Sequence, residues 1–84
     1  MHPDELINDK SSTPKYMQVL QLIISDIESG IYRQGEKIPS INETSEEYLI
    51  AKDTVEKAYR ELRTRGIIKP VKGKGYFVEN TRAL

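Results

Sequence analysis

Residues 40–66 read SINETSEEYLIAKDTVEKAYRELRTRG, and this stretch decides the fold. It opens with Ser40 and Glu43 at the spacing of a capping box. In that motif the serine hydroxyl accepts a hydrogen bond from the glutamate amide, and the glutamate carboxylate reaches back to the serine amide. A short helix is therefore predicted over residues 41–49. Its inward positions are predicted to be Ile41, Thr44, Ser45 and Tyr48.

A longer amphipathic helix is predicted over residues 52–65. Its apolar residues repeat at helical spacing and predict an inward face made of Val55, Ala58, Tyr59 and Leu62. Asp53 in the first turn suits the positive end of the helix dipole, and Gly66 suits the helix end. Because only about three residues separate this helix from the one before it, the two cannot form one rod and must cross.

The segment before this pair predicts a further helix, from residue 16 to about residue 29. Its apolar positions are Tyr16, Val19, Leu20, Ile23, Ile24 and Ile27. Pro14 suits the first turn, and Gly30 suits a left-handed cap at the end. The broad apolar stripe indicates core rather than a membrane or partner face. A turn at residues 34–35 and a short strand around residues 37–38 are predicted to follow.

After Gly66 the pattern changes to that of strands. Two β-rich runs, residues 67–71 and 76–78, flank the loop KGKG at residues 72–75, whose glycines can take the positive φ of a hairpin turn. Pro70 lacks an amide hydrogen and is predicted to face the open edge. The predicted fold is therefore α+β, a winged helix-turn-helix with three helices, a short strand and a C-terminal β-hairpin wing.

Length and composition restrict the possible functions. With 84 residues, of which 37% are apolar, the chain can build one core, predicted over residues 13–79. A flexible N-terminal arm is expected over residues 1–12, and a tail, or the start of a linker to an absent effector domain, over residues 80–84. The chain has no cysteine, one histidine and no apolar run of membrane-spanning length. We therefore expect a cytoplasmic protein that is not an enzyme and has no cofactor, metal site or membrane contact.

A net charge of zero conceals a strong asymmetry along the chain. Residues 26–56 carry eight acidic and three basic side chains, whereas residues 57–84 carry eight basic and two acidic ones. A field of one sign indicates a polyanionic or acidic partner. On composition alone, a solvated surface compensated by the acidic middle of the chain is an equally good interpretation.

The order of the elements favours DNA, because the second helix of a helix-turn-helix enters the major groove. The face of helix 52–65 opposite the apolar residues carries Asp53, Lys57, Arg60 and Thr64. Glu56 and Lys52 lie at the margins of this face. Lys57 and Arg60 suit phosphate contacts or guanine readout, and the carboxylates suit cytosine amino groups. Thr54 offers a hydroxyl from the first turn, and we expect replacement of Lys57 or Thr54 to alter base preference.

Two further groups of residues suit a phosphate. The start of helix 41–49, including Ser40 and Asn42, offers backbone amides at a positive dipole end. The hairpin tip, Lys72, Gly73 and Lys74, combines ammonium groups with glycines that allow close approach to a phosphate ridge or a narrow minor groove. Taken alone, such a tip is more often an exposed, soluble loop. It favours DNA only because of the helices that precede it.

Residues 15–78 resemble the DNA-binding domain of GntR-family bacterial transcription regulators. The residues that carry the resemblance are Pro14, Tyr16, residues 27–30, Gly35, Ile38, Pro39, Ser40, Lys52, Thr54, Val55, Ala58, Leu62, Gly66, Gly73, Gly75, Phe77 and Val78. The resemblance implies sequence-specific binding of double-stranded DNA for transcriptional regulation, most often repression, usually by homodimers on a palindromic operator. It also implies a C-terminal domain that senses a metabolite, which this sequence does not include.

Three positions depart from the family pattern. Asn42 and Glu56 stand where the family commonly has arginines that touch DNA, and Leu49 stands where a turn glycine is common. These departures imply an unusual operator sequence rather than a loss of DNA binding. The main alternative is a winged helix that serves as a protein-interaction module and docks its basic hairpin on an acidic partner.

Overall fold

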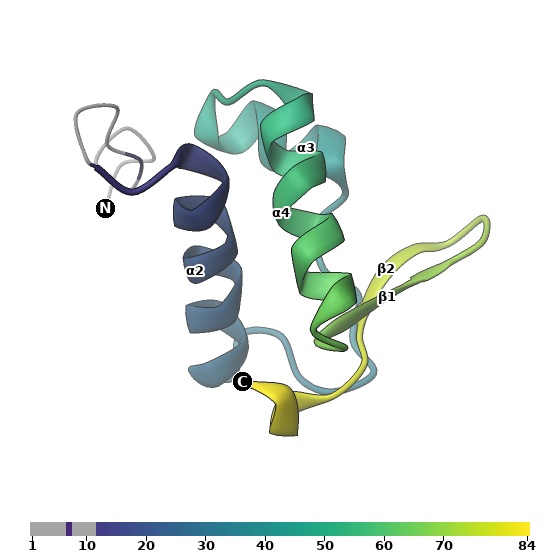
Figure 1. Cartoon of the computed structure of the whole chain (residues 1–84). Helices are drawn as coiled ribbons and strands as arrows, with labels where there is room; N and C mark the ends of the chain where they lie inside the picture. The colour runs from purple at the N-terminus through teal and green to yellow at the C-terminus, as the bar shows by residue number, and fades with distance from the viewer. Residues whose placement is uncertain (1–6, 8–11) are drawn as a thin grey trace.

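A computed structural model gives the fold, and it describes residue 7 and residues 12–84 (Figure 1). The elements are α2 (Lys15–Glu28), α3 (Ile41–Tyr48), α4 (Lys52–Thr64), β1 (Ile68–Val71), β2 (Gly75–Val78) and the 3-10 turn η1 (Thr81–Ala83). The three helices pack together, and the two strands project from them as a hairpin (Figure 1). This arrangement confirms the winged helix-turn-helix. Apart from positions 7 and 12, the arm expected over residues 1–12 lies outside the described residues.

The first helix, α2, follows the predicted pattern. It begins after Pro14, whose carbonyl accepts hydrogen bonds from the amides of Met17 and Gln18 at 3.0 and 3.1 Å. It ends before Gly30, which has a φ of +84°. Its fully buried apolar residues are Val19, Leu20, Ile23 and Ile27, which face α4 in the core. The other two predicted apolar positions, Tyr16 and Ile24, are only half-buried.

The helix pair also forms as predicted. The capping box closes in both directions: the Glu43 amide donates to the Ser40 hydroxyl, and the Ser40 amide donates to the Glu43 carboxylate, each at 3.0 Å. In α3 the side chains of Thr44 and Tyr48 are buried. The predicted inward face of α4 is confirmed at every position, with exposures of 0 or 1% for Val55, Ala58, Tyr59 and Leu62. Burial of this face leaves the opposite side of α4 in solvent.

The wing is a two-stranded antiparallel hairpin in which Pro70 pairs with Tyr76. The Tyr76 carbonyl accepts a hydrogen bond from the Ile38 amide at 3.0 Å, so its backbone groups point away from β1. Because opposed residues of a non-hydrogen-bonded pair both point outward, Pro70 faces the open edge as predicted. The strand expected around residues 37–38 is shorter than predicted, a single bridge between Lys37 and Phe77.

The last residues, expected to be a tail or the start of a linker, contain one short turn. Residues 81–83 form η1, and the side chain of Asn80 caps this turn by accepting a hydrogen bond from the Arg82 amide at 2.8 Å. The chain is held at this point because the Glu79 amide donates to the Ile67 carbonyl at 2.8 Å. Within the described part of the chain, no helix is long and apolar enough to span a bilayer.

Leu49 ends α3 in a left-handed conformation, with φ 55° and ψ 48°, and its side chain is 75% exposed. A left-handed conformation costs a residue with a Cβ about 1–2 kcal/mol, whereas glycine adopts it with a smaller entropic penalty. We therefore expect Leu49→Gly to raise the free energy of unfolding by about 1 kcal/mol, measured by urea denaturation. Leu49→Ala keeps the Cβ and is the control; an equal gain from both variants would contradict backbone strain as the cause.

Candidate nucleic-acid interface

The exposed side of α4 is divided between two neighbours. On one side the Lys57 ammonium lies 4.2 Å from the ring centroid of Tyr16 at the start of α2. On the other side the buried Tyr59 ring meets Tyr76 of β2 edge-on beneath the surface, with ring centroids 5.1 Å apart, so the wing borders α4 there. We call the first side, with Thr54 and Lys57, the α2 flank. The second side, with Glu56 and Arg60, is the wing flank.

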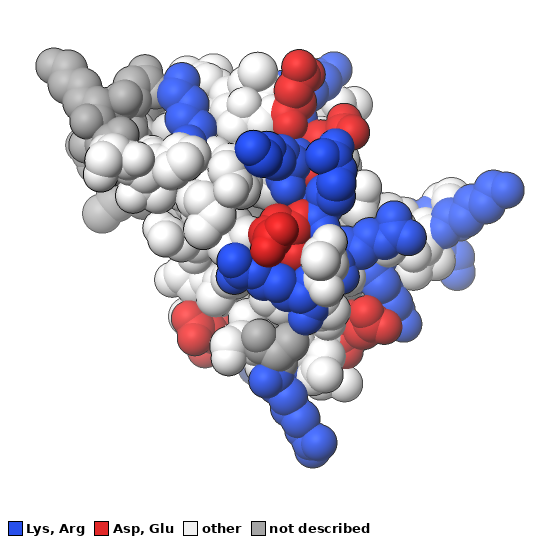
Figure 2. Space-filling view, in the orientation of Figure 1, with Lys and Arg blue, Asp and Glu red and all other residues white. Residues whose placement is uncertain are grey.

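The structure places the predicted α4 residues at the surface. Exposed side chains belong to Lys52, Asp53, Glu56, Lys57 and Arg60, whereas Thr54 is half-buried. Lysines and arginines gather over the front of α4 and continue along the hairpin, with acidic side chains among them (Figure 2). The outward orientation is therefore confirmed, while contact of these residues with DNA stays a prediction.

A shallow hollow marks the α2 flank. It is lined by Lys15, Tyr16, Asp53, Thr54 and Lys57, and so joins the first turns of α2 and α4. Among its described lining residues, two carry an ammonium group and one carries a carboxylate, so basic groups outnumber acidic ones there. An anion is the ligand that this charge favours.

The wing flank is internally paired. The Arg60 guanidinium lies 3.2 Å from the Glu56 carboxylate one turn earlier, and both side chains are about two-thirds exposed, at 66 and 60%. Exposed pairs at this spacing contribute only about 0.3–0.5 kcal/mol. Arg60 can therefore exchange Glu56 for a phosphate or a base edge at little cost.

The N-terminus of α3 offers fewer amides than the sequence suggested. Its capping box already engages the amides of Ser40 and Glu43. The Ser40 backbone amide, and after it the Ser40 hydroxyl, hold the pKa of the Glu43 carboxyl below its usual value. The expected phosphate contact is thereby reduced to the amides of Ile41 and Asn42, and the Asn42 side chain is exposed beside them.

The wing tip is exposed and built on glycine conformations. Gly73 and Gly75 have φ values of +76° and +118°, and the Lys74 amide closes the turn on the Val71 carbonyl at 2.9 Å. A Cβ at Gly75 would lie 3.0 Å from the Cε of Lys37. The side chains of Lys72 and Lys74 are exposed on either side of Gly73, so the tip presents two cations on a narrow backbone.

A buried hydroxyl sets the position of α4 against α3. The Tyr59 hydroxyl donates to the Pro39 carbonyl at 2.6 Å and lies 2.8 Å from the Thr44 hydroxyl. Burial is the main cause that raises the pKa of Tyr59. From sequence, Tyr59 was predicted only as an apolar core residue. Its hydrogen bonds fix the crossing of the two helices, and with it the position of the Ser40 cap relative to α4.

We expect Tyr59→Phe to lower the free energy of unfolding by about 2 kcal/mol, because it leaves the buried Thr44 hydroxyl and the Pro39 carbonyl without this partner. Thermal and urea denaturation measure the loss. Tyr48→Phe is the control, since within the described residues the Tyr48 hydroxyl makes no hydrogen bond. Equal losses from the two variants would show that the hydrogen bonds are not the cause.

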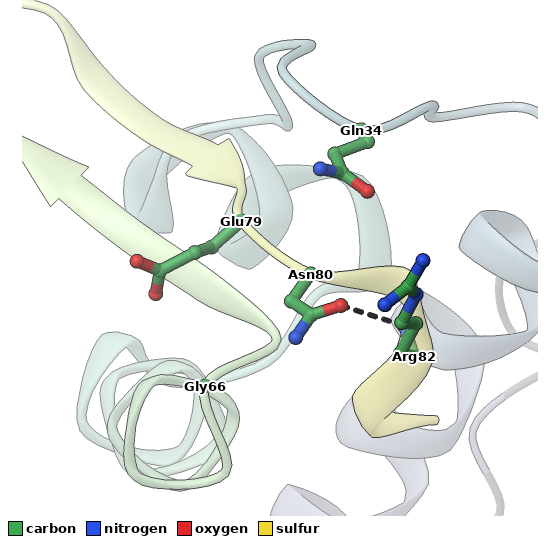
Figure 3. Close-up of a pocket in the computed structure, with 5 residues that line it drawn as sticks. All are labelled: Gln34, Gly66, Glu79, Asn80 and Arg82. Atoms are coloured by element: carbon green, nitrogen blue, oxygen red, sulfur yellow. Dashed lines mark hydrogen bonds between the residues drawn. The ribbon is translucent and has the colours of Figure 1, made fainter.

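A second hollow lies at the other end of α4. Its lining residues are Gln34, Gly66, Glu79, Asn80 and Arg82 (Figure 3). The Asn80 side chain bonds the backbone of Arg82, while the Glu79 carboxylate points away from Arg82 (Figure 3). These mixed charges do not converge on one ligand. Within the described residues, no group of three or more histidine, cysteine, aspartate or glutamate side chains is placed to hold a metal ion.

Sequence reasoning missed two residues of the α2 flank. The sequence pattern does not indicate Lys15 as a site residue, and it predicts Tyr16 only as one of the apolar core positions of the first helix. No local pattern could have found them, because their proximity to Lys57 depends on how α2 packs against α4.

Comparison with known proteins decides the family. The family model of bacterial regulatory proteins, gntR family, matches residues 15–78, most of the chain. The chain belongs to the gntR family. This confirms the resemblance seen in the residues of the helix-turn-helix and wing.

Three relatives illustrate the match of this gntR chain. It is 39% identical over 77 residues to the HTH-type transcriptional repressor YtrA of Bacillus subtilis (strain 168), covering 90% of this chain and 59% of that protein. A transcriptional antiterminator of Listeria monocytogenes EGD-e is 43% identical, with a TM-score of 0.83 and coverage of 88% and 55%. The AraR DNA-binding domain, in complex with operator ORX1, is 34% identical, with a TM-score of 0.80 and coverage of 87% and 92%.

The chain spans only part of the full-length relatives it matches, 59% of YtrA and 55% of the Listeria chain. By contrast, it spans nearly all of the AraR DNA-binding domain. It therefore corresponds to the winged-helix portion of gntR-family regulators.

Proposed function

We propose that this gntR domain binds double-stranded DNA sequence-specifically and regulates transcription, with α4 in the major groove and the wing on the adjacent backbone or minor groove. The observation that carries the proposal is the outward face of α4, exposed beside a hairpin tip with two lysines. The helix diameter, about 10–12 Å, matches a major groove about 12 Å wide. The AraR domain of the same fold is solved on its operators.

The predicted residues take distinct roles in this complex. Arg60 and Glu56 meet base edges from the wing flank of α4, Arg60 at guanine and Glu56 at a cytosine amino group. Asp53, Lys52 and Thr54 stand at the end of α4 that enters the groove first. A second set contacts the sugar-phosphate backbone: Ser40 and Asn42 at the start of α3, and Lys72, Gly73 and Lys74 at the wing.

We further infer that the regulator acts as a repressor in the bacterial cytoplasm and binds a palindromic operator as a homodimer. The repressor role is supported by the name of YtrA and of several other relatives. A two-fold dimer presents two α4 helices about 34–36 Å apart, one turn of DNA, so the operator symmetry mirrors that of the protein.

A selection of bound duplexes from a random library tests the proposal. We expect enrichment of one sequence family with a conserved half-site, and affinity that falls steeply with salt, by about 0.9 log units per phosphate contact for each tenfold increase. Absence of duplex binding at low salt would overturn the proposal and favour the protein-interaction module. Binding without enrichment would remove sequence specificity but leave DNA as the partner.

A further inference from the structure

We propose that Lys57 and Tyr16 form a clamp for a backbone phosphate of duplex DNA, in which Lys57 supplies the charge and Tyr16 is a positioning residue. The proposal rests on the proposed function and deepens it. It assigns Lys57 to the DNA backbone, where the sequence left both a phosphate contact and guanine readout open. It also brings α2, so far a core helix, to the DNA.

The first observation is the stack itself. The Lys57 ammonium lies 4.2 Å from the centroid of the Tyr16 ring, well within the reach of a cation–π contact. A free lysine on a helix surface samples many rotamers, and ordering it on binding costs free energy. Tyr16 holds Lys57 on the α2 flank before DNA arrives. The Lys57 ammonium is therefore already positioned on the α2 flank, and the Lys57 side chain is still exposed to a ligand.

The second observation is what surrounds the stack. The hollow on the α2 flank is lined by Lys15 and Thr54 beside Lys57, and Asp53 is the acidic residue among the part of its lining that the structure describes. A hydroxyl donor and two ammonium groups suit the oxygens of a phosphate, which accept hydrogen bonds. A phosphate offers only acceptors, which the hydroxyl and the ammonium groups can meet together.

The third point is geometric. A helix nearly fills the width of the major groove, so a side chain that is held against a neighbouring helix outside the groove meets the groove wall. The groove walls are the sugar-phosphate backbones. The Tyr16 ring draws Lys57 to the α2 flank, away from Arg60 and Glu56, which pair on the other flank. Lys57 therefore reaches a phosphate rather than a base.

The test compares two duplexes, the sequence enriched by the selection and a scrambled duplex of the same composition. We expect Lys57→Ala to weaken both by the same factor, about eightfold at 0.1 M salt, and to reduce the salt slope by about 0.9. A Lys57→Ala variant that weakens only the enriched duplex, or changes the enriched bases, would overturn the clamp and assign Lys57 to base readout.

Tyr16 is tested by coupling to Lys57. Tyr16→Leu should weaken both duplexes about two- to fivefold, and Tyr16→Phe, which keeps the aromatic face, should restore the lost affinity. In the Lys57→Ala background, Tyr16→Leu should cause no further loss, because its only expected effect is on Lys57. Losses that multiply in the double variant would show that Tyr16 acts independently and would overturn the positioning role.

Two measurements separate the remaining explanations. Circular dichroism and thermal denaturation check that each variant is folded before its binding is compared. Titration with inorganic phosphate at constant ionic strength asks whether the site takes a free anion. Saturable binding at submillimolar phosphate that depends on Lys57 would overturn the assignment to duplex DNA, and absence of all wild-type duplex binding would instead overturn the proposed function.

Discussion

Alanine at both wing lysines, Lys72 and Lys74, is expected to weaken binding about sixtyfold at 0.1 M salt, on enriched and scrambled duplexes alike. Both side chains are exposed at the hairpin tip, where they can each neutralise one phosphate. Loss of two phosphate contacts should reduce the slope of log affinity against log salt by about 1.8. Titrations of labelled duplex at several salt concentrations measure both quantities.

The matched control removes the same charge elsewhere. Arg33 is exposed in the loop that follows α2, and Arg82 is exposed in the C-terminal turn η1. The C-terminal end of the chain lies away from the hairpin tip (Figure 1). We expect the double variant Arg33→Ala and Arg82→Ala to keep most of the salt slope. If the two double variants lose the same affinity, the loss is due to the change in net charge and not to contacts between the wing and DNA. If the wing variant binds unchanged, the wing has no part in binding.

Replacing Ala58 with leucine is expected to lower the free energy of unfolding by about 3 kcal/mol, near the upper end for overpacking. Ala58 has no exposed surface and lies on the face of α4 that packs against the other helices. Three added carbons have no space there without moving a helix. In a domain of this size, with roughly 4–12 kcal/mol of total stability, the loss is large enough to unfold a substantial fraction.

Ala51→Leu is the control for this prediction. Ala51 caps the same helix but its side chain is exposed, so the change should stay within about 0.5 kcal/mol. Urea denaturation of both variants provides the comparison. A stable Ala58→Leu domain would contradict the close packing on the inner face of α4 and, with it, the outward direction of Lys57 and Arg60.

Much of the fold was predictable because its signals are local. The capping box at Ser40 and Glu43 spans one turn, and the apolar spacing of α4 repeats within the helix, so both patterns indicate structure without reference to the rest of the chain. The hairpin was predictable for the same reason. The strand near Lys37 was overestimated because its pairing depends on Phe77, a residue distant in the sequence.

The candidate site was predictable only in part. Periodicity identified which α4 residues face solvent, since burial of one face determines the other. It did not separate the two flanks of α4, because that division depends on which neighbouring element lies on each side. Nor did it show that the Arg60 guanidinium is paired with Glu56, or that the capping box occupies the amides of Ser40 and Glu43.

The amino-acid sequence by itself determined the three helices, the hairpin and the outward face of α4, since each is specified by residues within a few turns of one another. Tertiary structure alone decided the contact of Tyr16 with Lys57 and the bonds of the Tyr59 hydroxyl to Thr44 and Pro39. These contacts join residues from different elements. They depend on the distance and crossing angle of packed helices, which no local spacing of residues encodes.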